Sequence, residues 1–226
     1  CSSWSAASDG YKSQSRKGPS WYGASEEAGP GTLALCYRPP GRGGAAGPLK
    51  AIRPRLVGTG SMTTLQAQEE LSTARRLGLL DAYREAAAET GIDVAILLGK
   101  DSRESRLTQA LSPSCTGDNG FGRGISQIDS RFYPVFTETT DPCNHAAYAK
   151  EGARILAERL REFDGRVPPA LAAYNAGAES VRGALEEGRD VDSVTTGGDY
   201  SEDVLRRADA FGEVLPAHEA HLPAGL

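Results

Sequence analysis

Residues 117–129 read Gly-Asp-Asn-Gly-Phe-Gly-Arg-Gly-Ile-Ser-Gln-Ile-Asp, and this segment is the best guide to the architecture of the chain. Its glycines allow the backbone to turn sharply and to approach a ligand closely, and they are Gly117, Gly120, Gly122 and Gly124. Asp118 and Asp129 lie on either side of these glycines. Each aspartate also has a purely structural interpretation, because Asp-Asn-Gly is typical of a turn and Asp-Ser of a helix cap.

The sequence on both sides of this segment has helical patterns. Before it, apolar residues at helical spacing predict a helix from about Thr64 to Thr90, which Gly91 ends, and Asp93 can cap a second helix from Val94 to about Arg106. After it, a loop through Pro134 and Pro142 leads to helices predicted at 146–163, 168–177, 178–187 and 201–214. Strand candidates are few, so the predicted fold class is mainly α.

Composition divides the chain of 226 residues into two regions. Residues 1–61 hold eleven of the 27 glycines and six of the 13 prolines without sustained periodicity, and we expect an irregular segment there. Residues 62–226 are expected to form one helical domain. The first region has eight Lys and Arg against three Asp and Glu, and the second has seventeen against twenty-seven.

These charges and the hydropathy exclude two classes of partner. An acidic body argues against nucleic-acid binding, which needs a basic face. No apolar run approaches the roughly 20 residues needed to cross a bilayer, so we expect no membrane insertion.

The four cysteines are Cys1, Cys36, Cys115 and Cys143. They form no CxxC pair, and with three scattered histidines they predict no metal site. The economical pairing is Cys1 with Cys36 and Cys115 with Cys143; the second bridge would contribute roughly 3–4 kcal/mol on the loop-entropy model. The alternative is four reduced thiols in a cytosolic protein.

Four segments, in this order, resemble the goose-type lysozymes and the related bacterial lytic transglycosylases. They are Ser102-Arg-Glu-Ser-Arg106, the segment 117–129, Ala173-Tyr-Asn-Ala-Gly177 and Thr196-Gly-Gly-Asp-Tyr-Ser-Glu-Asp-Val204. The resemblance implies a lysozyme-like domain of about seven helices around a central buried one, with the Gly-rich loop forming one side of a groove. It implies peptidoglycan glycan strands as the partner, no cofactor, a monomer and a secreted protein.

Glu104 is the predicted catalytic acid. Glycoside cleavage needs a carboxylic acid that is still protonated near neutral pH, so that it can give its proton to the leaving oxygen. Glu104 ends an apolar helix on the same face as Leu97, and we expect non-polar neighbours that favour the protonated form. The alternative is a solvated glutamate paired with Arg103, Arg106 or Lys100.

Asp118 and Asp129 are implied as the second half of the catalytic apparatus. An inverting glycosidase needs a carboxylate about 6.5–9.5 Å from the acid, with a water between them. A lytic transglycosylase needs no such water, because it closes the sugar on itself to an anhydro product. A binding protein without activity has no need of three carboxylates in one groove, so hydrolysis of the β-1,4 bond between N-acetylmuramic acid and N-acetylglucosamine is the favoured reading.

The resemblance also implies substrate-binding residues, each of which could instead be an ordinary packing residue. They are Gln127, Tyr133, Tyr174, Asn175 and Tyr200, and Tyr200 is expected to reach towards Glu104. Three positions depart from the family pattern. Ser126 stands where relatives commonly have methionine, Tyr133 where they often have a histidine that contacts sugar, and Lys100 where they are usually apolar. An ammonium pointing into the groove at Lys100 would favour the ionised acid and weaken activity.

The role of residues 1–61 stays open at this point. Their aromatic residues could mark a small wall-binding module, since aromatic rings stack on sugars, and they are Trp4, Trp21, Tyr22 and Tyr37. The segment could also be a linker or a tag, because the single methionine, Met62, follows Gly-Thr-Gly-Ser and precedes the first helical pattern.

Overall fold

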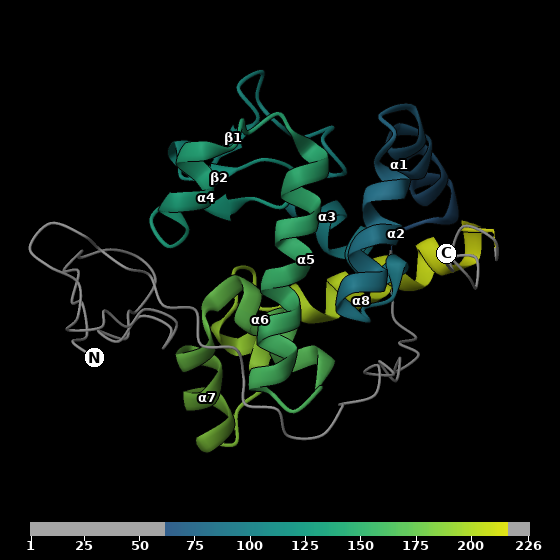
Figure 1. The fold of residues 1–226 in the computed structure, drawn as a ribbon. Helices are drawn as coiled ribbons and strands as arrows, with labels where there is room; N and C mark the ends of the chain where they lie inside the picture. The colour runs from purple at the N-terminus through teal and green to yellow at the C-terminus, as the bar shows by residue number, and fades with distance from the viewer. Residues whose placement is uncertain (1–61, 217–226) are drawn as a thin grey trace, which may run out of the picture. The chain divides into compact units, whose positions relative to one another are not determined.

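A computed structural model describes residues 62–216, and within them the fold is mainly α-helical with one small sheet (Figure 1). The helices are α1 (Thr64–Arg76), α2 (Leu79–Thr90), α3 (Val94–Ser105), α4 (Pro134–Thr139), α5 (His145–Glu162), α6 (Val167–Ala176), α7 (Ala178–Glu186) and α8 (Tyr200–Val214). This confirms the predicted class. The expected irregular segment 1–61 and the Cys1–Cys36 pairing lie outside the described residues.

The first predicted helix is in fact two helices. Thr63 and Gln66 form a capping box at the start of α1, and α1 ends at Arg76. Gly78 then adopts φ +66°, a left-handed conformation that favours glycine, and α2 begins at Leu79. The prediction of one helix over 64–90 was wrong because the apolar pattern continues across this break.

Helix α3 is the central buried helix. The Asp93 side chain accepts a hydrogen bond from the Ala95 amide at 2.7 Å and caps its first turn. Most of its residues are buried, and it packs on α8 through Gly99, where a Cβ would lie 2.7 Å from the carbonyl oxygen of Val204. Glycine at this position therefore permits the close approach of the two helices that carry Glu104 and Tyr200.

The Gly-rich segment forms a three-stranded antiparallel sheet in the order β1 (Thr116–Gly117), β2 (Gly122–Arg123), β3 (Ile128–Asp129). Gly122 is the partner of Gly117 on one side and of Asp129 on the other. A 3-10 turn, η1 (Asp118–Gly120), connects the first two strands. The sheet therefore brings Asp118 and Asp129 towards each other.

Helix α4 was missed in the sequence, where Pro134 was assigned to a loop. Proline has no amide hydrogen to donate and a fixed φ, so it suits the first turn of a helix, and Pro134 occupies that position. In Figure 1 the sheet and α4 lie beside one end of α5, whereas α6 and α7 lie beside the other end.

The predicted bridge between Cys115 and Cys143 is present, with 5.3 Å between the two Cα atoms. It joins the residue before β1 to the residue two positions before α5. The small sheet is thereby anchored to the long helix.

Candidate active site

Glu104 lies in the last turn of α3, partly buried, and Tyr200 reaches it from the start of α8. The Tyr200 hydroxyl donates a hydrogen bond to Oε1 of Glu104 at 2.5 Å, which confirms the expected contact. Burial, followed by the negative charge of Glu104, raises the pKa of Tyr200 well above its ordinary value. The phenol therefore keeps its proton and remains a donor to the carboxylate.

The turn before Tyr200 is fixed by the buried side chain of Asp192, in the 3-10 turn η2 (Val191–Val194). This carboxylate accepts hydrogen bonds from the Ser201 amide at 2.8 Å, the Ser201 hydroxyl at 2.7 Å and the Glu202 amide at 3.1 Å. These bonds satisfy donors at the first turn of α8. They also fix the position from which the Tyr200 ring extends.

Arg103, the neighbour of Glu104, turns away from the acid towards α8. It donates to Asp203 at 2.8 Å and to Asp199 at 2.9 Å, and its guanidinium carbon is 5.8 Å from the centroid of the Tyr200 ring. An ion pair between Glu104 and Arg103 was an alternative drawn from the sequence, but the Arg103 guanidinium is paired with Asp203 and Asp199.

Tyr174 and Asn175 lie in the last turn of α6, and the charge of Glu104 acts on Tyr174. The Tyr174 hydroxyl donates to the carbonyl of Ser126 at 2.9 Å, and burial followed by the charge of Glu104 raises the pKa of Tyr174 well above its usual range. The side-chain oxygen of Asn175 accepts from the Thr196 amide at 2.8 Å. Asn175 thus has a structural contact of its own, which joins α6 to the loop before α8.

Asp118 and Asp129 share one guanidinium. Arg131 donates to Asp129 at 2.7 Å and 2.9 Å and to Asp118 at 3.4 Å. The hydrogen bond to Asp129 is the main reason that the pKa of Arg131 is raised, so this cation stays charged. Asp129 is nearly buried whereas Asp118 is exposed, with side-chain exposures of 11% and 61%. The two aspartates lie together although eleven positions separate them.

Gln127 is held inside the sheet. Its amide nitrogen donates to the carbonyl of Gly124 at 2.8 Å, and a Cβ at Gly117 or Gly122 would lie 2.1 Å or 2.5 Å from its side-chain oxygen. Gly124 similarly makes room for the ring of Tyr148. These three glycines therefore accommodate protein side chains, whereas the sequence suggested that they admit a sugar.

Tyr133 precedes α4 and extends towards α5. Burial raises its pKa, while the charge and the hydrogen bond of Arg159 act in the opposite direction. Arg159 is itself paired with Glu162 at 2.7 Å. The tyrosine at position 133, where the resemblance leads us to expect a histidine, thus contacts the Arg159 guanidinium.

Lys100 does not point into a groove. Its side chain is fully buried, and its ammonium is paired with the equally buried carboxylate of Asp101. From the sequence, an ammonium in the groove was expected to favour the ionised form of Glu104 and weaken activity. That effect requires an unpaired positive charge, whereas the charge of Lys100 is paired with that of Asp101. Sequence reasoning missed both Asp101 and Arg131; for Arg131 the signal was a basic residue two positions after Asp129.

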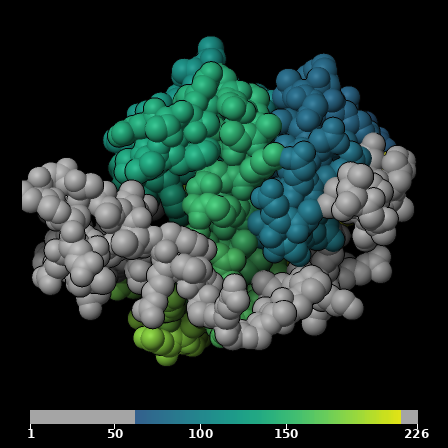
Figure 2. Space-filling view, viewed as in Figure 1, coloured from purple at the N-terminus to yellow at the C-terminus, as the bar shows by residue number. Residues whose placement is uncertain are grey.

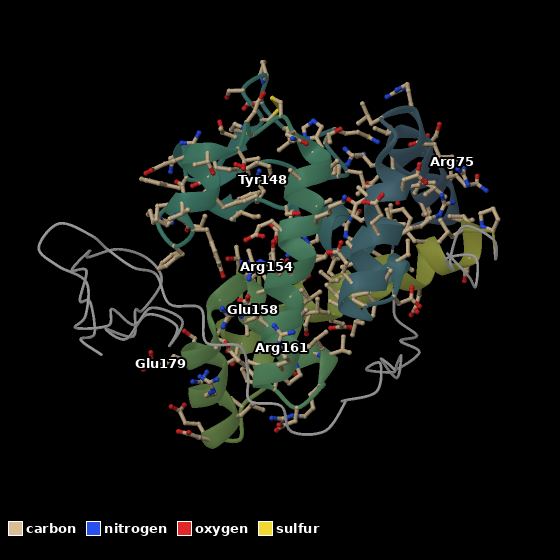
Figure 3. All side chains as sticks on the ribbon, in the orientation of Figure 1. Arg75, Tyr148, Arg154, Glu158, Arg161 and Glu179 are labelled. Carbon is tan, nitrogen blue, oxygen red and sulfur yellow. A yellow bond between two sulfur atoms is a disulfide. The ribbon has the colours of Figure 1, made fainter. Side chains whose placement is uncertain are left out.

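A hollow of about 470 Å³ lies between α2, α4 and α5. None of the predicted site residues lines it; its lining comprises Glu89, Thr90, Phe136, Ala147, Lys150, Glu151, Arg154, Ala157 and Arg161. Figure 2 shows the exposed face of α5 between the regions of α2 and α4, and Figure 3 labels Arg154 and Arg161 on this helix. Glu104 does not line this hollow, so the hollow is not evidence for a glycan-binding groove beside the proposed acid.

Two further features bear on the class of protein. Within residues 62–216, no three His, Cys, Asp or Glu side chains are grouped so that they could hold a metal ion. Among the same residues, no helix has the length and apolar character needed to span a membrane.

The family model for lysozyme g matches residues 61–213. The chain belongs to the lysozyme g family. It is 30% identical over 158 residues to lysozyme G of Dromaius novaehollandiae, covering 64% of this chain and 73% of that protein. It is 33% identical over 153 residues to lysozyme g of Takifugu rubripes, covering 63% and 78%, and 31% identical over 146 residues to that of Casuarius casuarius, covering 58% and 74%.

Membership of the lysozyme g family makes this chain a glycoside hydrolase with a glycan substrate. The matched range begins just before α1 and ends within α8, so it spans the helices described above. The resemblance stated from four short segments is therefore confirmed over the whole helical domain.

Proposed function

We propose that this lysozyme g family member is a muramidase that hydrolyses the β-1,4 bond between N-acetylmuramic acid and N-acetylglucosamine with inversion at the anomeric carbon. Glu104 acts as the general acid and gives its proton to the leaving oxygen. Asp118 and Asp129 hold the water that attacks the opposite face of the sugar. The peptidoglycan strand is the partner, and the enzyme acts as a secreted monomer.

The observation that carries this proposal is the shared contact of Asp118 and Asp129 with Arg131. A pair of carboxylates on one side of a glycan can accept hydrogen bonds from a single water and orient it. The Arg131 guanidinium, which contacts both carboxylates, holds them close to each other.

The acid is supported by its own contact. The Tyr200 hydroxyl orients the Glu104 carboxyl through Oε1. This is the arrangement of a base or acid held by a third group. Gln127, Tyr133, Tyr174 and Asn175 are proposed to line the glycan site, as the family resemblance implies.

The rival reaction is that of a lytic transglycosylase, and the products distinguish the two. Bacterial walls are digested, early products are followed by proton NMR, and fragments are analysed by mass. An inverting hydrolase gives reducing sugars whose new hydroxyl is in the α configuration. Predominantly 1,6-anhydro products would refute the hydrolytic proposal and leave Glu104 as the single catalytic carboxyl.

A further inference from the structure

A buried ion pair lies in α3 close to the proposed glycan site. The side chains of Lys100 and Asp101 both have 0% exposure, and the ammonium bonds to Oδ1 of Asp101. The Tyr83 hydroxyl donates to Oδ2 at 2.8 Å. Each carboxylate oxygen thus has a donor, which satisfies the main condition for keeping such a pair in a core.

The surrounding residues are small enough to make room for the ammonium. A Cβ on Gly152, in α5, would lie 2.7 Å from the Lys100 nitrogen and 2.5 Å from the Ser126 hydroxyl oxygen. The Lys100 ammonium and the Ser126 hydroxyl therefore both depend on the absence of a side chain at Gly152.

This polar cluster contacts Tyr174. The Lys100 nitrogen is 3.5 Å from the Tyr174 hydroxyl oxygen and 4.8 Å from the centroid of its ring. The same hydroxyl donates to the carbonyl of Ser126 at 2.9 Å. The phenol oxygen therefore accepts from an ammonium and donates to a carbonyl, which fixes both its position and the direction of its proton.

Stability alone is a poor reason for this arrangement. A buried ion pair is often no more stabilising than apolar residues of similar volume. The ion pair of Lys100 and Asp101 can instead fix the orientation of a side chain that it contacts. That side chain is Tyr174, whose hydroxyl also donates a hydrogen bond to the carbonyl of Ser126.

We propose that Lys100 and Asp101 are positioning residues, which hold the phenol of Tyr174 in one orientation towards the bound glycan. This inference rests on the proposed function, because it takes Tyr174 as part of the glycan site. The pair acts through Tyr174 and does not itself touch the substrate.

The test is a mutant cycle in the full chain that separates stability from positioning. The variant Tyr83→Phe/Lys100→Met/Asp101→Leu removes the whole cluster and leaves an apolar core, and Lys100→Met alone leaves Asp101 buried without its cation. We expect the single variant to lose about 10 °C in melting temperature and the triple variant to recover most of that loss. Lys100→Met/Asp101→Asn, which removes both charges and keeps an acceptor for Tyr83, serves for the same cycle if the triple variant does not fold.

Kinetics on soluble wall glycan then decide the inference. We expect the triple variant and Tyr174→Phe each to lower kcat on the order of tenfold or more with a smaller change in KM, and their combination to be no worse than either alone. Wild-type kcat and KM in the stable triple variant, or losses that multiply in the combination, would overturn it.

A binding measurement separates this inference from the proposed function. If the wild-type protein cleaves no bacterial wall, the proposed function fails, and the same cycle is measured by calorimetry with a soluble N-acetylglucosamine oligomer. Non-additive losses of affinity would then support the positioning role independently of hydrolysis. Additive losses, or none, would refute it.

Discussion

The hydroxyl of Tyr200 and the carboxyl of Glu104 form a 2.5 Å hydrogen bond between residues 96 positions apart in the chain. The bond exists because α8 begins beside the end of α3, and Gly99 lets these two helices approach closely. The phenol thereby fixes the position of one oxygen of the carboxyl. The geometry makes Glu104 the first residue to test.

Replacing Glu104 by Gln should abolish wall cleavage, because the amide keeps the size of the side chain and loses the transferable proton. The expected loss is on the order of 10²–10⁴ in kcat, with an unchanged melting temperature. Turbidity of a wall suspension measures the cleavage. Glu69→Gln, at an exposed position on α1, is the matched control and should behave like the wild type. More than a few per cent residual activity in the Glu104 variant would contradict the assignment.

Single changes Asp118→Asn and Asp129→Asn should each weaken catalysis only partly, because either aspartate can still hold the water. We expect the rate of hydrolysis to fall about tenfold for each single change and on the order of 10²–10⁴-fold for the double change. Initial rates on soluble wall glycan measure the effect, and Asp164→Asn, at an exposed aspartate, is the control. A double variant as active as the wild type would remove both residues from the mechanism.

Asp203 should make stability depend on pH. Burial alone would raise its pKa, but the hydrogen bonds and charges of Arg207 and Arg103 more than offset it, and the net shift is downward. A depressed folded pKa contributes stability that is present above the unfolded value near pH 3.9 and is lost as pH falls through the lower, folded value. Asp203→Asn should therefore cost about 2–3 kcal/mol at pH 7 and much less near pH 2.

Urea unfolding at both pH values measures this difference. The control is Asp81→Asn, which breaks an exposed pair with Arg84 and should change the free energy of unfolding by less than about 1 kcal/mol. An equal cost for Asp203→Asn at both pH values would show that its charge is not responsible.

Removing the bridge by Cys115→Ser/Cys143→Ser should destabilise the domain by roughly 3–4 kcal/mol and lower its melting temperature by about 10 °C. Calorimetry with and without a reducing agent measures the change. Reduction should lower the melting temperature of the wild-type protein and leave that of the double variant unaffected. No response of the wild-type protein to complete reduction would contradict the expected contribution.

Deletion of residues 1–61 should leave hydrolysis of soluble wall fragments intact. The family match begins at residue 61, and the capping box of α1 begins at Thr63. Activity and circular dichroism of the shortened protein are the measurements. A protein that is folded but inactive would place a catalytic contribution within the deleted segment.

The sequence predicted the elements that depend on local signals. The cap at Asp93, the prolines that open α6 and the bridge from Cys115 to Cys143 all follow from residue type and spacing. The break at Gly78 and the helix at Pro134 were misread, because a continuous apolar pattern and a proline each have two interpretations.

The site was predictable in its residues but not in its contacts. Four short segments indicated Glu104 and the aspartates, because catalytic residue types recur at fixed spacing. Their partners follow from the fold: Arg131 joins Asp118 in the turn η1 to Asp129 in β3, and Asp101 faces into the core beside Tyr83. Such pairings depend on which side of an element a residue occupies after packing, and spacing alone does not give that.

The side chain of Gln127 lies against the backbone of Gly117 and Gly122, within a sheet whose strands are only two residues long. A larger residue at either glycine would meet the end of this flexible side chain, so the glutamine would have to change its rotamer. That change would break the hydrogen bond that the Gln127 amide donates to the carbonyl of Gly124. Exchanges at Gly117 and Gly122 are therefore coupled to Gln127 in the evolution of this loop.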